Sequence, residues 1–182
     1  RLFDNSATPA NLKSYIKLIT SLKEKYRNKI TLFTGIEVSI NDIEDDINEP
    51  LITLNNHFDI ILFEYVNMET FFKFISLRKK ISVPVGLAHP SLKRSFPENY
   101  YDELIEELEK HNVFLELNTS KQYYVNDENF YTRLKGRKIK LTIGTDTHFA
   151  SKKSLSCLEP AINFIEKLVL ENNVLNPVDI FK

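Results

Sequence analysis

The sequence predicts an α/β protein built on a parallel sheet. Short apolar runs alternate along the chain with stretches of helical spacing, and the runs are apolar on both faces, as buried parallel strands are. Five such runs are present, which is the order expected of repeated βαβ units. A doubly wound sheet and a barrel would both satisfy this pattern. A complete eight-unit barrel needs about 200 residues or more, so these 182 residues would form a short or incomplete one.

The predicted helices and strands follow in a regular order. The first helix begins at Thr8-Pro9, a capping hydroxyl followed by proline at the first helical position, and runs to about Tyr26. Further helices are expected over 68–80, 96–112, 128–137 and 156–172, and strands over 30–40, 58–66, 81–90, 113–120 and 138–146. The segment 41–50 is expected to form an acidic loop or a short helix. The apolar face of the last helix is expected to consist of Leu158, Ile162, Ile165 and Val169.

Composition and charge exclude several classes of protein. The 24 basic and 25 acidic residues nearly balance, so direct binding to nucleic acid is not expected. With 42% hydrophobic residues the chain can fill one core, which predicts a single domain over 1–182. No apolar run approaches the roughly 18 to 20 residues of a membrane span, and no signal peptide is visible. The single cysteine, Cys157, fits a reducing compartment, so a cytoplasmic protein without membrane contact is expected.

Ligand-type side chains stand near the ends of four predicted strands. They are Glu37, His89, Glu116, Asn118, Asp146 and His148. In parallel α/β folds the carboxyl ends of all strands lie on one side, where the active site is found. Carboxylates and imidazoles together suit zinc, manganese or iron. An isolated Asp-x-His pair is a weak signal, because a turn aspartate beside a surface histidine looks the same, but the grouping at several strand ends predicts a metal centre.

The alternation of side chains along a strand gives a further expectation for this centre. It places His89 on the same face as Val85 and Leu87, and Glu37 on the same face as Gly35. Both faces are expected to be directed inward where the strands end. The two side chains should therefore converge with the other ligands at the carboxyl end of the sheet.

Five segments of the chain resemble, in order and spacing, successive motifs of the polymerase-and-histidinol-phosphatase (PHP) superfamily. They are "LFTGIEVSI", "DIILFEYVN", "VGLAHPSL", "FLELNTSK" and "LTIGTDTHFASKKSL". The likeness is greatest to the histidinol-phosphatase-like branch of metal-dependent phosphoesterases. It covers nearly the whole chain and is most specific in the final Gly-Thr-Asp-Thr-His.

This resemblance implies a fold, a cofactor and roles for individual residues. The fold would be a distorted (β/α)7 TIM-like barrel with two or three divalent metal ions (Mn, Fe or Zn) at the carboxyl ends of its strands. Glu37 would be a bridging carboxylate and His89 a metal ligand. Asp146 and His148 would be the last pair of ligands and the catalytic residues. The remaining two, Glu116 and Asn118, would support the geometry of the loop.

Two departures from the family pattern bear on these expectations. The family opens with a strand ending in His-x-His and a second strand ending near another histidine, whereas the first histidine here is His57. Two amino-terminal strands are therefore expected to be missing, which leaves five βα units of seven. The second visible strand of the family ends in Ser-x-His, whereas "FEYVN" leaves Glu64 or Asn67 near that place. A carboxylate or an amide can also ligate a hard cation.

Basic side chains after the strand ends complete the predicted site. Arg94, Lys121 and Lys152 lie where a phosphate would need cations, although surface lysines commonly serve solubility alone. His57 and His111 are expected to be surface residues. The expected function is metal-dependent hydrolysis of a phosphorylated small molecule. A non-catalytic PHP-like scaffold subunit with a degenerate metal site is the main alternative, and a metal-dependent hydrolase of the amidohydrolase type is a third.

Overall fold

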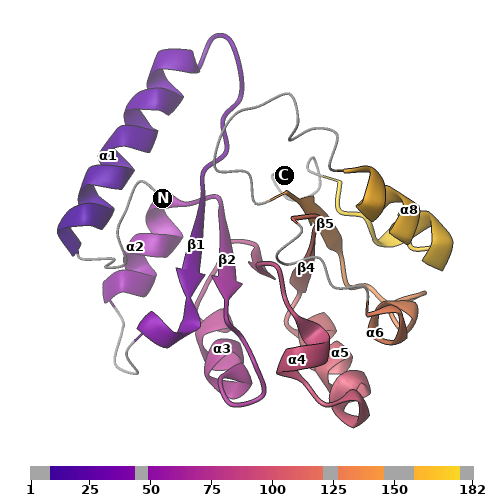
Figure 1. Cartoon of the computed structure of the whole chain (residues 1–182). Helices are drawn as coiled ribbons and strands as arrows, with labels where there is room; N and C mark the ends of the chain where they lie inside the picture. Colours follow the sequence, from indigo (N-terminus) through magenta and orange to yellow (C-terminus); the bar gives the residue numbers. More distant parts are fainter. Residues whose placement is uncertain (1–8, 44–48, 121–126, 146–157, 177–182) are drawn as a thin grey trace.

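The computed structural model describes residues 9–43, 49–120, 127–145 and 158–176. Five parallel strands form one sheet in the order β1-β2-β3-β4-β5, which confirms the α/β class and the parallel sheet (Figure 1). The strands are β1 (Gly35–Ser39), β2 (Ile60–Glu64), β3 (Val85–Leu87), β4 (Val113–Asn118) and β5 (Leu141–Gly144). Each is shorter than its predicted apolar run.

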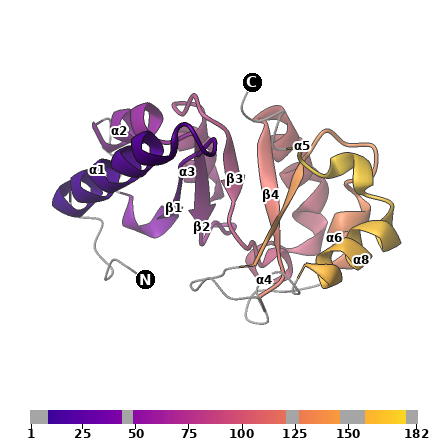
Figure 2. The ribbon, with the colours of Figure 1, turned by 90° about the horizontal axis from the view of Figure 1, so that it is seen from above.

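The helices flank the sheet, with α1 and α2 beside β1 and with α6 and α8 toward β5 (Figure 2). They are α1 (Pro9–Tyr26), α2 (Glu49–His57), α3 (Phe71–Arg78), α4 (Leu92–Ser95), α5 (Tyr101–Lys110), α6 (Glu128–Thr132) and α8 (Glu159–Leu168). Three single 3-10 turns, η1 (Ile40–Asp42), η2 (Glu98–Tyr100) and η3 (Glu171–Asn173), complete the described elements. None of the described helices has the length and apolar character needed to cross a lipid bilayer.

One face of the sheet is covered by helices and forms the core. Its strand residues pair in register across the sheet and are almost fully buried: Ile61, Phe63, Val85, Leu87 and Leu115. Side chains of α3, α5 and α8 pack against this face, namely Phe71, Phe74, Leu104, Leu108, Phe164 and Ile165. Burial of each such side chain stabilises the fold by about 1.5 to 3 kcal/mol. The core therefore fixes the strands whose carboxyl ends carry the predicted ligands.

The opposite face of the sheet carries acidic residues and glycines. Glu37 pairs with Leu62, Leu62 with Gly86, and Gly86 with Phe114, so these residues share one face. Glu64 and Glu116 lie two residues beyond Leu62 and Phe114 and are therefore on the same face. A Cβ at Gly144 would lie 1.8 Å from Oε1 of Glu116, so any other residue there would force the Glu116 side chain to move. The Glu116 side chain thus lies against Gly144 of the neighbouring strand β5.

The two edges of the sheet are β1 and β5. Within the described residues each of them pairs with one strand, and they do not pair with each other. Next to β5, Leu141 forms a single parallel bridge with Val174, and the Leu175 N–H donates to the Leu141 carbonyl at 2.8 Å. The described strands therefore form an open sheet.

The last helix buries a different face from the one predicted. In α8 the buried side chains are Ala161, Phe164 and Ile165, whereas Ile162 is 43% exposed and Val169 is 55% exposed. Both sets of positions have helical spacing, since apolar residues occur all around this segment. Val169 also lies beyond the helix, where it adopts a left-handed φ of 57° as the C-cap. The prediction that Ile162 and Val169 face the core is therefore wrong.

Helix α1 is tied to the sheet through Asp59, which directly precedes β2. The Asp59 carboxylate accepts hydrogen bonds from Lys23 Nζ at 2.6 Å and from the N and Oγ1 of Thr34 at 2.6 and 2.9 Å. Burial alone would raise the pKa of Asp59, but the hydrogen bonds from Lys23 and Thr34 outweigh it and hold the pKa below its ordinary value of 3.8. The ionised carboxylate therefore stabilises the folded state.

Replacing Asp59 with asparagine should lower stability at neutral pH and make it less sensitive to acid. A carboxyl whose pKa is depressed on folding stabilises the native state above its unfolded pKa, and this contribution is lost as the pH falls through the folded pKa. The free energy of unfolding, measured by urea titration over a pH series, should show a difference between wild type and Asp59→Asn that shrinks below 3.8. A difference independent of pH would show that the charge of Asp59 does not contribute.

Candidate metal centre

Three ligand-type side chains converge at the carboxyl end of the sheet. Nε2 of His89 lies 2.9 Å from Oε1 of Glu37 and 3.6 Å from Oε2 of Glu64. One ligand atom from each residue lies within 4.8 Å of the others. The three residues come from β1, from the end of β2 and from the loop after β3, so the sheet order brings neighbouring strand ends together.

The position of His89 corrects the prediction made from strand alternation. Val85 and Leu87 lie on the helix-covered face, and simple alternation would turn His89 toward that face as well. Instead β3 ends at Leu87, and His89 has a left-handed φ of 31°. This turn brings the imidazole to the opposite face, where Glu37 and Glu64 lie. A positive φ at a non-glycine residue costs roughly 1 to 3 kcal/mol and is characteristic of functional sites.

Glu116 holds the His89 turn in place. Its Oε2 accepts a hydrogen bond from the His89 backbone N–H at 2.7 Å and a second one from Nδ2 of Asn118 at 3.2 Å. Oδ1 of Asn118 in turn accepts from the Ser120 N–H at 2.8 Å. Glu116 and Asn118 thus contact backbone N–H groups around the site, while the carboxylate atoms near Nε2 of His89 belong to Glu37 and Glu64.

The group carries an excess of negative charge around one imidazole. Burial alone would lower the pKa of His89, but the hydrogen bond and charge of Glu37, together with the charges of Glu116 and Glu64, raise it. Burial raises the pKa of Glu64, and the nearby charge of Glu37 raises it further, against the opposing charge of His89. The neighbouring carboxylates repel each other, and a cation held between them would relieve this repulsion.

The chemistry of these donors fits a divalent metal ion. Two carboxylates and an imidazole are ligands of manganese, iron and zinc in proteins. The His89 side chain is 9% exposed, that of Glu64 is 23% exposed, and that of Glu37 is 43% exposed. The group is therefore anchored on one side by packing and accessible from solvent on the other, as a centre that exchanges substrate must be.

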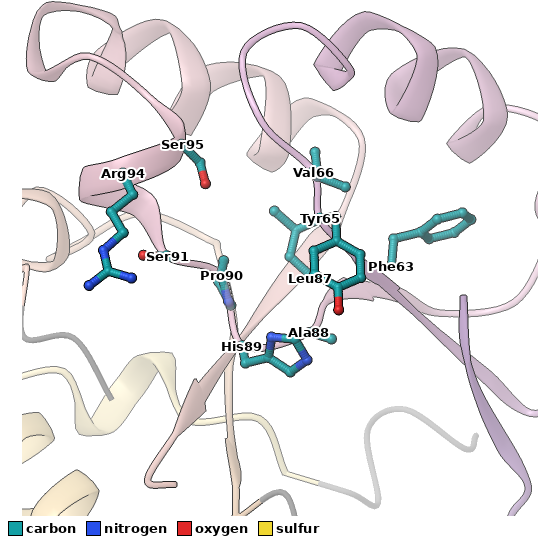
Figure 3. A pocket seen from close by; sticks show the side chains of 10 residues that line it. All are labelled: Phe63, Tyr65, Val66, Leu87, Ala88, His89, Pro90, Ser91, Arg94 and Ser95. Atoms are coloured by element: carbon teal, nitrogen blue, oxygen red, sulfur yellow. The ribbon is translucent and has the colours of Figure 1, made fainter. Parts of the chain in front are cut away.

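A pocket of about 260 Å³ opens beside this group. Tyr65 and Val66 form one side, and Ser91 and Arg94 line the other, with His89 at the lower end in the view of Figure 3. Among the described residues, the buried Oγ of Ser91 has no hydrogen-bond partner. The Arg94 guanidinium on this wall is a suitable donor for the oxygens of an anionic group.

The other predicted site residues have different outcomes. Asn67 is not part of the group, because its Oδ1 accepts hydrogen bonds from the N–H groups of Glu69 and Thr70 just before α3. Its side chain thus organises the β2–α3 loop instead of facing His89. Four further predicted site residues lie outside the described residues: Lys121, Asp146, His148 and Lys152.

The two histidines predicted at the surface differ from each other. His57 is exposed at the end of α2, as predicted. His111 is largely covered, with 13% of its side chain exposed and Nε2 at 3.3 Å from Oε2 of Glu107. The surface prediction for His111 is therefore wrong, because the end of α5 packs this ring against its own helix.

Tyr65 is a neighbour of the group that sequence reasoning did not identify. It adopts a left-handed φ of 62° directly after β2. With this turn its ring lines the pocket beside His89. A tyrosine after a strand carries no sequence signal for such a turn, because glycine and asparagine are the residues usual there.

Comparison with known proteins does not assign the chain to a family. No protein-family model matches the sequence, and no curated protein matches it either.

Proposed function

We propose that the protein is a metal-dependent phosphoesterase of the PHP type that hydrolyses a phosphorylated small molecule. The observation that supports this most strongly is the convergence of Glu37, Glu64 and His89 at the carboxyl end of a parallel sheet. A divalent ion (Mn, Fe or Zn) bound there would activate a water molecule and neutralise charge on the phosphoryl oxygens. A cytoplasmic location, as expected from the lone cysteine, belongs to the same proposal.

In this proposal each residue of the site has a distinct task. Glu37, Glu64 and His89 would hold the ion, and Asp146 and His148, which follow β5 in the sequence, would complete the ligand set. The hydrogen bond from the His89 N–H to Glu116 fixes the imidazole in the turn that faces the two carboxylates.

Phosphate binding is assigned to groups beside the ligands. The Arg94 guanidinium lines the pocket and would orient the phosphoryl group. Lys121 and Lys152, which follow ligand-bearing strands in the sequence, would add further positive charge. The proposal needs no serine or cysteine nucleophile, in agreement with the lack of a nucleophile-elbow motif in the sequence.

The proposed fold is the distorted (β/α)7 barrel that the sequence resembles. The order β1-β2-β3-β4-β5, with β1 and β5 at the two edges of the described sheet, is compatible with two more strands between those edges. Exposed edge strands are liable to pair with other chains, so a strand on each edge would also remove that liability.

A second candidate is a non-catalytic scaffold with a degenerate metal site. It is favoured by Glu64, a carboxylate at the place where the family that the sequence resembles has an imidazole. The two functions differ in a simple respect, since a scaffold would neither retain metal ions nor turn over a phosphate ester.

Activity of the Asp146→Ala variant tests the proposed function. The full-length protein and its variants should be assayed with an aryl phosphate and a panel of phosphorylated metabolites, with metal content measured in parallel. Loss of a ligand carboxylate should reduce turnover by well over the roughly 10- to 100-fold typical of residues that only support ligands. The control is His57→Ala, which changes an exposed side chain and should retain wild-type activity. Equal turnover by wild type and Asp146→Ala would remove the proposed mechanism.

A further inference from the structure

We infer that Glu64 biases the metal centre toward a hard divalent cation, so that Mn²⁺ competes with Zn²⁺ far better than it would at an imidazole-rich site. This inference rests on the proposed function, because it concerns which ion the same centre takes. It follows from the donor atoms that the structure brings together and from the way Glu64 is held.

The described donors are rich in oxygen. Two carboxylates, from Glu37 and Glu64, face a single imidazole nitrogen, from His89. Carboxylate oxygens suit manganese and magnesium, whereas imidazole and thiolate ligands favour zinc. The carboxylate at Glu64 therefore carries much of the bias, since an imidazole in its place would make nitrogen the majority donor.

Glu64 is held in position before any ion binds. It is the last residue of β2, in register with Ser39 of β1, and its side chain is 23% exposed. Its Oε2 lies 3.6 Å from Nε2 of His89, and Tyr65, which follows it with a left-handed φ of 62°, lines the pocket beside His89. In Figure 3 the Tyr65 hydroxyl points toward the His89 end of the pocket. A carboxylate fixed in this way is a built ligand rather than a mobile surface acid.

The spacing of the donors agrees with one shared ion. Two ligands at about 2.1 Å from one cation lie about 3 Å apart when they are at right angles and about 4 Å apart when they are opposite. Nε2 of His89 lies 2.9 Å from Oε1 of Glu37 and 3.6 Å from Oε2 of Glu64. Both distances fall in or close to this interval.

The bias has to be measured as a ratio of affinities. Zn²⁺ binds most nitrogen and oxygen sites more tightly than Mn²⁺, whatever the protein, so absolute affinity does not show what the ligands select. The informative quantity is the Zn²⁺/Mn²⁺ affinity ratio of the wild type compared with that of variants at Glu64.

The experiment is equilibrium binding of MnCl₂ and ZnCl₂, separately, to the metal-stripped full-length protein. Wild type, Glu64→His and Glu64→Gln should be compared, with dialysis and elemental analysis giving the bound metal. The Zn²⁺/Mn²⁺ affinity ratio should rise by about tenfold or more in Glu64→His, because nitrogen replaces oxygen. It should also rise in Glu64→Gln, which keeps the shape of the side chain but removes the charge on which Mn²⁺ depends most. Glu69→Gln, an exposed change in the loop after β2, should leave the ratio unchanged.

The outcomes separate the inference from the proposed function. A ratio that stays within about twofold of wild type in both Glu64 variants would overturn the selectivity inference while leaving a metal centre in place. A wild type that binds neither ion would overturn the proposed function and this inference with it. Because Glu64→Gln is nearly isosteric, it carries the test even if the imidazole variant does not fold.

Discussion

Replacing His89 with alanine should abolish metal retention and reduce phosphate-ester hydrolysis by more than about a hundredfold. Nε2 of His89 is the atom that faces both Glu37 and Glu64, at 2.9 and 3.6 Å. Without it the two carboxylates are left to repel each other, and the one described nitrogen donor of the group is lost. Turnover of an aryl phosphate and metal content after dialysis, measured on the same preparations, check this expectation.

Two comparisons make the His89 result specific. Near-ultraviolet circular dichroism should show that His89→Ala retains its tertiary packing, since the backbone N–H that donates to Glu116 is still present. Glu116→Gln should lose activity less severely than His89→Ala, because it weakens the support of the turn and leaves the imidazole. Metal content and turnover that both remain at wild-type levels in His89→Ala would exclude this residue from the centre.

Replacing Asn173 with alanine should destabilise the fold by about 2 to 4 kcal/mol. Asn173 is 4% exposed, and its Nδ2 donates to the carbonyls of Leu134, Arg137 and Ile139 at 3.2, 3.1 and 2.8 Å. This one amide ties the loop after α6 and the start of the β5 segment to the chain after α8. Removing it takes this donor from the carbonyls of Arg137 and Ile139, while the Leu134 carbonyl keeps the N–H of Arg137 at 2.9 Å. Loss of a donor to a buried carbonyl is more costly than loss of a solvated hydrogen bond.

The neighbouring residue gives a matched control for this change. Asn172 is exposed, and its backbone carbonyl accepts a hydrogen bond from Lys140 Nζ at 2.9 Å. Asn172→Ala should therefore change the free energy of unfolding by less than about 0.5 kcal/mol. Urea denaturation of both variants measures the difference. A loss below about 1 kcal/mol for Asn173→Ala would show that the carbonyls of Arg137 and Ile139 find other donors.

The fold class could be predicted from the sequence because its signals are local and repeated. Helix α1 begins and ends as predicted, at Pro9 and Tyr26, since a capping pair marks its start and apolar residues keep helical spacing behind it. The short helices α2 and α4 were not predicted as helices. Neither carries a long periodic pattern, and a helix of one or two turns depends on the surrounding packing more than on its own sequence.

The metal centre could be predicted in part. The types and strand-end positions of Glu37 and His89 were sufficient to expect them together, and the structure brings them into contact. The side of the sheet on which His89 lies could not be predicted, because one left-handed φ reverses the alternation that sequence reasoning assumes. Glu64 and Asn67 are close in sequence, yet pairing of β2 with β1 brings Glu64 into the group. Asn67 is instead turned to the α3 N-terminus by local hydrogen bonds from the N–H groups of Glu69 and Thr70.

Removal and return of the metal ion is the most direct measurement of the proposed phosphoesterase. The full-length protein should be stripped with a chelator, dialysed, and assayed with an aryl phosphate while Mn²⁺ is titrated back. Hydrolysis is expected to be absent after stripping and to return in proportion to bound Mn²⁺, because in the proposed mechanism the bound ion activates the attacking water. Full hydrolysis by protein shown by elemental analysis to be free of metal would contradict the proposed function, as would a metal-loaded protein that hydrolyses no phosphate ester.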